Sequence, residues 1–164
     1  MRRITPERVL EVANAIINGV EFGFLITRSE SGEANARIMH PFAPEQDLAI
    51  WFGTSQESRK MREIQRDNRV TLAFYDSKET AYTTLIGTAL VERDVDTRRK
   101  YWREEWLAFF PEGPEGEDYV LVKFIPSRIE VMSFAHGILP KPYRLRPAVL
   151  VRSGDSWITE KRQG

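Results

Sequence analysis

The chain has 164 residues, of which 41% are hydrophobic and 29% charged, and it contains no cysteine. Its 24 basic residues balance its 24 acidic residues, which argues against a general nucleic-acid binder, and without cysteine it has no disulfide, zinc–thiolate site or cysteine nucleophile. No run approaches the roughly 18 apolar residues that span a bilayer, and the N-terminal segment lacks the form of a signal peptide, so we expect a cytoplasmic protein with no membrane or nucleic-acid partner.

The length favours a single domain built around one core. We expect this domain to cover residues 1–164, with its core at about 20–134 and a C-terminal extension at 137–164. No internal repeat, low-complexity segment or shift in composition marks a boundary within the chain.

Three short helices are expected, each with a recognisable start. The hydroxyl of Thr5 precedes proline and glutamate, which is typical of a helix N-terminus, and Gly19 can end that helix. The Thr-x-x-Glu form of residues 54–57 predicts a capping box before a second, charged helix. Asp94 is expected to cap a third helix that carries several aromatic residues: Tyr101, Trp102, Trp106 and Phe109.

Between these helices, apolar runs of strand length alternate with turn residues. Many strands, few helices and no regular strand–helix alternation predict an antiparallel sheet that closes on itself. Pro126 is expected to divide one long apolar run into two strands. The expected strands are residues 22–27, 34–40, 48–53, 70–75, 82–92, 119–125 and 128–134, with a further one near 149–152.

Most familiar catalytic motifs are missing from the sequence. It has no Walker-type phosphate loop, no GxGxxG after a strand and no GxSxG elbow. Two histidines, His40 and His136, are too few for a histidine-rich metal site, and no carboxylate spacing indicates a metal. We therefore predict no metal ion and identify no residue as a general acid or base.

The strongest local signal lies where a strand meets a helix at residues 51–60. The expected helix opens with Ser58, Arg59 and Lys60. A helix N-terminus attracts anions, and basic side chains there are unfavourable unless an anion compensates them. Taken alone, these residues fit an anion site and a pair of solvent-exposed surface charges equally well.

Several segments together resemble the pyridoxamine-phosphate-oxidase-like split-barrel family. Thr54 precedes Lys60 by six positions, as in that family's flavin-phosphate motif, with Gly53 in place of a tyrosine. Residues 36–39 are similar to the family's Arg-x-Met strand, whose arginine reaches the flavin phosphate. Further matching segments follow in order at residues 68–74, 85–89, 110–114 and 126–131.

The sequence departs from true pyridoxamine phosphate oxidases at the substrate site. Phe42 stands where those enzymes have a substrate-binding lysine, and Met132 where they have a tryptophan. Their tyrosine–arginine–serine phosphate cluster has no counterpart in residues 101–110, and Tyr82 aligns with their flavin-facing glutamine. The chain thus resembles the general-stress-protein branch, and we expect no true pyridoxamine phosphate oxidase activity.

The resemblance implies a mainly β fold, an antiparallel Greek-key split β-barrel that binds flavin mononucleotide (FMN), with three short helices. It implies that Tyr82 contacts the flavin, across the interface of a homodimer. A homodimer is also expected because residues 101–110 hold more aromatic surface than one short helix need bury. The other implied cofactor residues are Arg37, Ser58, Arg59 and Lys60 at the phosphate, and Ile38, Met39, Gly53 and Thr54 along the ribityl chain and ring.

Three functions stay open from the sequence. The first is an FMN-dependent oxidoreductase acting on a small molecule, and the second is a non-catalytic flavin-binding stress protein. The third is the same barrel holding a haem or a deazaflavin. Ile38 and Met39 also fit an ordinary core, and Tyr82 fits a sheet position with an exposed hydroxyl.

Overall fold

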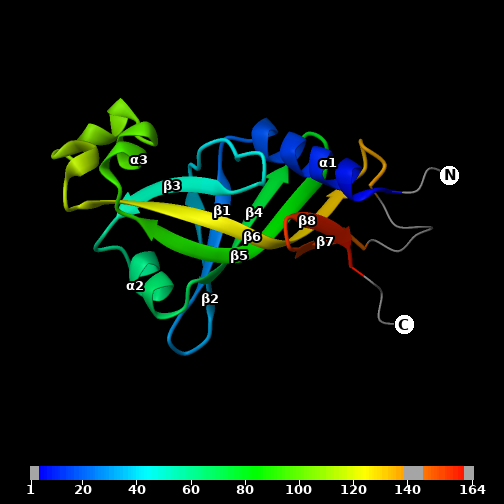
Figure 1. Ribbon diagram of the computed structural model, residues 1–164, viewed down its shortest axis with the longest axis horizontal. Coiled ribbons are helices and arrows are strands. Elements are labelled where there is room, and N and C mark those ends of the chain that lie inside the picture. Colours follow the sequence, from blue (N-terminus) through cyan, green and yellow to red (C-terminus); the bar gives the residue numbers. More distant parts are fainter. Residues whose placement is uncertain (1–3, 139–145, 161–164) are drawn as a thin grey trace.

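The computed structural model describes residues 4–138 and 146–160, which form a mainly antiparallel sheet with a few helices. Its strands are β1 (Gly23–Arg28), β2 (Ala34–Met39), β3 (Ile50–Ser55), β4 (Arg69–Asp76), β5 (Ala81–Glu92), β6 (Tyr119–Ser133), β7 (Ala148–Ser153) and β8 (Ser156–Thr159). They follow the order β2–β1–β4–β5–β6–β7–β8, and β3 pairs with β6 (Figure 1). The prediction of an antiparallel sheet with few helices is confirmed, but the strand pairings of the described residues leave the sheet open, so it does not close on itself as expected.

The long strand β6 organises the sheet. One edge pairs with β3 along its first half and with β7 along its second half, while β5 pairs along the other edge. The expected break at Pro126 was wrong: β6 continues, and the β5–β6 register shifts between Ile86 and Gly87 instead. A Cβ on Gly87 would lie 2.0 Å from the carbonyl oxygen of Ile125, so this close approach requires glycine.

Helix α1 (Pro6–Gly19) packs against β4, β5 and β6 on the side of the molecule away from the second helix (Figure 1). It begins as predicted, with the Thr5 hydroxyl accepting a hydrogen bond from the Arg8 N–H at 3.3 Å. Apolar residues recur at helical spacing and face the sheet, which anchors the helix to the main core. The buried residues of this face are Val9, Val12, Ala13, Ile16 and Ile17.

Helix α2 (Arg59–Arg66) begins later than the Thr-x-x-Glu pattern predicts. Its N-cap is Ser58, whose hydroxyl accepts a hydrogen bond from the Met61 N–H at 3.4 Å. Thr54 cannot cap this helix because β3 continues past it, pairing Thr54 with Val120 of β6. The predicted capping box was therefore wrong, although the helix itself is present.

Helix α3 (Val95–Lys100) is capped by Asp94 as predicted, with the Thr97 N–H donating at 2.9 Å. It ends before the aromatic residues, which lie in and around the 3-10 helix η1 (Glu104–Ala108); a second 3-10 helix, η2 (Gly113–Glu115), follows. These aromatics pack on the end of β3 and β6 as a second, smaller core, which we call the aromatic cluster. Its members are Phe42, Trp51, Tyr101, Trp102, Trp106, Phe110 and Tyr119.

The aromatic cluster bears on the expected homodimer. Tyr101 stacks on Trp51 with ring centroids 4.7 Å apart, and Trp102 and Trp106 meet at 5.8 Å. Phe109 points away and is 74% exposed. Most of the aromatic surface thus packs within one chain, so it does not by itself require a partner.

The C-terminal region continues the sheet through a hairpin of β7 and β8. The strand expected near residues 149–152 corresponds to β7, whereas β8 was not expected. Residues 139–145 and 161–164 of the expected C-terminal extension lie outside the described residues. Within the described ranges, no helix is both long and apolar enough to cross a membrane.

Candidate functional site

Arg37 lies in β2 on the inner face of the sheet, opposite Leu25 of β1. Its Nη1 donates to the Leu25 carbonyl oxygen at 3.2 Å and to Thr27 Oγ1 at 2.6 Å, and its Nη2 donates to Glu63 Oε2 at 3.2 Å. The side chain is 18% exposed. Because side chains alternate along a strand, the next residue, Ile38, lies on the outer face and is 61% exposed. Arg37 is thus an interior cation with a defined orientation.

Glu63, in the second turn of α2, is the acidic partner of Arg37. Its side chain is 7% exposed and accepts hydrogen bonds from the Thr27 hydroxyl, from Asn35 Nδ2 at 2.6 Å and from Arg37. Burial raises the pKa of Glu63, but the three hydrogen bonds outweigh it and place the pKa below its usual value. The carboxylate is therefore ionised at neutral pH.

Lys60, in the first turn of α2, reaches back to β3. Its Nζ donates to Thr54 Oγ1 at 2.8 Å. Burial, and then the positive charge of Arg37, lowers the pKa of Lys60. No carboxylate of residues 4–138 and 146–160 forms an ion pair with this lysine. Lys60 is thus a half-buried cation beside another cation, without an acidic partner.

Ser58 and Arg59 complete this end of α2. The Ser58 hydroxyl accepts from the helix backbone, which leaves its own hydrogen free to donate. Arg59 is more exposed, and its Nε lies 3.7 Å from Glu63 Oε1. We call Arg37, Arg59 and Lys60 the basic cluster; together with Glu63 it carries three positive charges and one negative charge, a net +2. This positive charge favours an anion, and the dipole of α2 adds to the effect.

Two other residues expected to line the cofactor pack inside the chain. Met39 is 8% exposed and belongs to the main core. Gly53 alternates with Thr54 along β3 and faces the aromatic cluster, where a Cβ would lie 2.5 Å from Trp106 and 2.6 Å from Tyr119. The packing of these rings explains why glycine occupies the position.

Tyr82 lies on the outer face of β5, between Tyr75 of β4 and Met132 of β6. Burial, together with the charge of Glu130, raises the pKa of its hydroxyl. No hydrogen bond or ion pair among the described residues connects Tyr82 with the basic cluster. Within one chain the structure therefore brings together Arg37, Thr54, Ser58, Arg59 and Lys60, and it leaves Ile38 and Tyr82 on the other face of the sheet.

Sequence reasoning missed Glu63, Thr27 and Asn35. A partial signal was present, because Glu63 follows Arg59 by four residues and lies beside the buried Ile64 on the same helix. Thr27 and Asn35 face each other across β1 and β2. That relation depends on strand register, which a single polar residue in each strand does not reveal.

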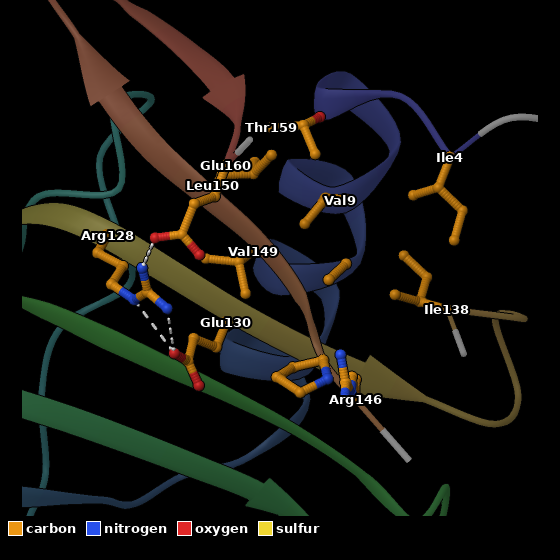
Figure 2. A pocket seen from close by; sticks show the side chains of 12 residues that line it. Ile4, Val9, Arg128, Glu130, Ile138, Arg146, Val149, Leu150, Thr159 and Glu160 are labelled. Atoms are coloured by element: carbon orange, nitrogen blue, oxygen red, sulfur yellow. Dashed lines mark hydrogen bonds and ion pairs between the residues drawn. The ribbon is translucent and has the colours of Figure 1, made fainter. Parts of the chain in front are cut away.

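A pocket of about 530 Å³ opens elsewhere, between α1 and the strands β6, β7 and β8 (Figure 2). Its floor includes Val9 and Leu150, and on its polar wall Arg128 pairs with Glu130 at 2.9 Å and with Glu160. One arginine shared by two glutamates leaves these three residues with a net charge of −1. None of the residues predicted to bind a cofactor lines the pocket.

No hydrogen bond or ion pair among the described residues links either histidine to the basic cluster. His40 packs against Phe22 at 5.1 Å between ring centroids, and His136 Nδ1 lies 2.9 Å from Ser133 Oγ. In the part of the chain that the structure describes, no three side chains of histidine, aspartate or glutamate are grouped to hold a metal ion.

Three solved structures illustrate which proteins share this fold. A Clostridium acetobutylicum protein related to general stress protein 26 of B. subtilis is 18% identical, with a TM-score of 0.73 over 90% of this chain and 96% of that one. A pyridoxamine 5'-phosphate oxidase-related, FMN-binding protein of Nostoc punctiforme is 13% identical, with a TM-score of 0.73 over 96% of both chains. PhzG of Burkholderia lata, solved with tetrahydrophenazine-1-carboxylic acid, is 19% identical, with a TM-score of 0.70 over 98% of this chain and 93% of that one.

These likenesses confirm the expected split-barrel fold. A comparison with curated proteins gave no match. The model of the family described as "Pyridoxamine 5'-phosphate oxidase like" matches residues 8–145, most of the chain. The order of the motifs, the antiparallel sheet and this match agree, and the chain belongs to the pyridoxamine 5'-phosphate oxidase-like family.

Proposed function

We propose that this chain binds FMN through its phosphate and uses it to oxidise or reduce a small molecule. The observation that carries the proposal is Lys60, a half-buried ammonium beside Arg37 with no carboxylate of its own in the described chain. Glu63 compensates the charge of Arg37, but no carboxylate of the described residues compensates the partly desolvated charge of Lys60, which is costly unless an anion binds there. A bound phosphate supplies that anion.

The charge of the site fits a phosphate monoester. Such a group carries about −1.5 to −2 near pH 7, which balances the net +2 of the basic cluster and Glu63. Arg37 uses three of its five N–H donors on protein acceptors, which leaves two for a ligand. Lys60, Arg59 and the Ser58 hydroxyl are the other donors at the start of α2.

The flavin would supply the redox chemistry, and the residues around it would supply orientation. In this proposal, Thr54 and the backbone of Gly53 lie along the ribityl chain, with Ile38 and Met39 of β2 nearby. Ile38 offers an apolar surface and Tyr82 a ring with a polar hydroxyl. No residue is assigned a proton transfer.

We propose that a second copy of the chain completes the site. Phe24, Ile38 and Tyr75 are 48%, 61% and 61% exposed on the outer face of the sheet, and Phe24 pairs directly with Ile38. A contiguous exposed apolar face of this kind is typical of an interface. Tyr82 lies on this face and Arg37 on the opposite one, so a flavin that contacts both would lie where two copies meet.

The proposal excludes pyridoxamine phosphate as the substrate. Phe42 packs in the aromatic cluster, 5.2 Å from Tyr101 between ring centroids, and contributes no charge for a second phosphate. Among similar structures, one is a haem-binding protein of Mycobacterium smegmatis, 19% identical, with a TM-score of 0.60 over 79% of this chain and 55% of that one. Haem receives less support than FMN here, because His136 is hydrogen-bonded to Ser133 and His40 packs on Phe22.

The test is a titration of flavin-free protein with FMN and with riboflavin, followed by flavin fluorescence. One charge-assisted phosphate bond contributes about 1.5–3 kcal/mol, so FMN should bind at least about tenfold more tightly than riboflavin. Equal affinities would refute the phosphate site.

A second experiment separates an oxidoreductase from a non-catalytic flavin carrier. The FMN complex is mixed anaerobically with NADH or NADPH. Bleaching of the flavin absorbance indicates an oxidoreductase, and its absence favours a carrier.

A further inference from the structure

Glu63 places a negative charge inside a site that otherwise attracts anions. Its carboxylate is almost fully buried, bonded to Arg37 and Asn35, and 3.7 Å from Arg59. Neither the phosphate contacts nor the flavin contacts proposed above require this residue. A charge held this deeply in a binding site changes the energy of any ligand charge that enters.

Glu63 acts on an incoming phosphate in two ways. It occupies an N–H of Arg37 that would otherwise be free to donate to the ligand. It also repels the phosphate, since like charges within a partly desolvated site interact more strongly than in water. Both effects weaken binding, and both depend on the negative charge rather than on the size of the side chain.

We propose that Glu63 limits the affinity of this site for a phosphate monoester by neutralising one of the three cations in the basic cluster. This inference rests on the proposed function, because it concerns the same anion site. It makes the flavin an exchangeable ligand, held by a net charge of +2 rather than +3.

The direct test is Glu63→Gln, which keeps the shape and removes the charge. FMN should bind about tenfold more tightly than to the unmodified protein, a change of about 1.4 kcal/mol, and riboflavin should bind equally to both. Glu57→Gln is the matched control, because this exposed glutamate lies one residue before the N-cap of α2. Its effect on FMN should stay below about twofold, since exposed charges are screened.

A second pair of variants separates charge from structure. Arg37→Met leaves Glu63 charged and without its main partner, so it should lose FMN affinity strongly. Adding Glu63→Gln restores the net charge of +2 through Arg59 and Lys60, so the double variant should bind FMN at least about tenfold more tightly than Arg37→Met. The two variants are compared under conditions where circular dichroism shows both to be folded, so that a gain in FMN affinity reports the charge of Glu63 rather than recovery of the fold.

The outcomes distinguish this inference from the proposed function. If unmodified protein binds FMN and riboflavin equally, the proposed function fails, and the rise in melting temperature caused by inorganic phosphate then tests Glu63. A larger rise in Glu63→Gln supports the inference; an equal or smaller one overturns it. If FMN binds as proposed, unchanged or weaker binding to folded Glu63→Gln overturns it. If the Glu63→Gln variant does not fold, the double variant decides. FMN binding to the double variant that is no tighter than to Arg37→Met then overturns the inference.

Discussion

Replacing Lys60 with methionine should move flavin binding and protein stability in opposite directions. Methionine keeps the length and the apolar stem of lysine but removes the ammonium. In the flavin-free protein this ammonium has one hydroxyl partner, Thr54, and a second cation, Arg37, nearby. Removing it relieves a desolvated charge, so the flavin-free variant should unfold at the same temperature or higher.

The loss in binding follows from the contact that disappears. A hydrogen bond from a charged donor contributes about 1.5–3 kcal/mol, and about 1.4 kcal/mol corresponds to a factor of ten in affinity. Lys60→Met should therefore weaken FMN by about 10- to 150-fold. Riboflavin has no phosphate, so its affinity should stay within about twofold. The same substitution at Arg62, an exposed residue two positions further along α2, is the matched control and should change neither affinity by more than about twofold.

The measurements are fluorescence titrations with both flavins and thermal unfolding without flavin. A Lys60→Met protein that binds FMN as tightly as the unmodified protein would remove Lys60 from the phosphate site. A melting temperature several degrees below that of the unmodified protein would show that Lys60 supports the fold. Either result would contradict the view that Lys60, which has no acidic partner, serves to bind a phosphate.

Three further predictions address the pH response, the aromatic cluster and the outer face. The pKa of Lys60 is lowered, and only the charged lysine attracts the phosphate. FMN affinity should therefore stay constant below that pKa and fall as the pH rises through it. The Lys60→Arg variant should show no such fall in the same titrations. Gly53→Ala, whose Cβ would lie 2.5 Å from the Trp106 ring, should lose about 1–3 kcal/mol of unfolding free energy in urea, and an unchanged midpoint would contradict this packing. Phe24→Glu on the exposed outer face should yield a monomer by light scattering; a dimer of unchanged affinity would place the interface elsewhere.

The fold was largely predictable because its signals are local. Strand-length apolar runs, a threonine cap at Thr5 and an aspartate cap at Asp94 each depend on a few neighbouring residues, and all correspond to elements of the structure. The errors arose where a distant partner decides the outcome. Thr54 stays in a strand because β6 pairs with it, and Pro126 is accommodated by a register shift against Gly87.

The site was predictable in part for the same reason. Ser58, Arg59 and Lys60 are neighbours in sequence, so their position at a helix start is visible directly. Glu63 joins them through Thr27 and Asn35, residues that register brings together from two other strands. A pattern of spacing along one segment contains no information about that register.

The ion pair between Glu63 and Arg37 decides which substitution of Arg37 is informative. From the sequence, Arg37→Ala is the natural test, and a folded but largely colourless protein is the expected result. In the structure, this change also leaves a buried carboxylate without its cation, and breaking a buried pair costs about 3–5 kcal/mol. Arg37→Ala should therefore lower the melting temperature without any flavin present, while Arg37→Lys should recover part of both stability and FMN affinity, since lysine keeps the charge but not the planar fork.

Thermal unfolding of flavin-free Arg37→Ala, beside Arg37→Ala/Glu63→Gln, separates the two contributions. The double variant should regain much of the lost melting temperature, because its glutamine needs no counter-charge, yet it should still bind FMN more weakly than Glu63→Gln alone. Unchanged stability of Arg37→Ala would mean that Glu63 does not depend on this ion pair. Unchanged FMN affinity in a well-folded Arg37→Ala protein would remove Arg37 from the phosphate site and leave Lys60 and Arg59 as its cations.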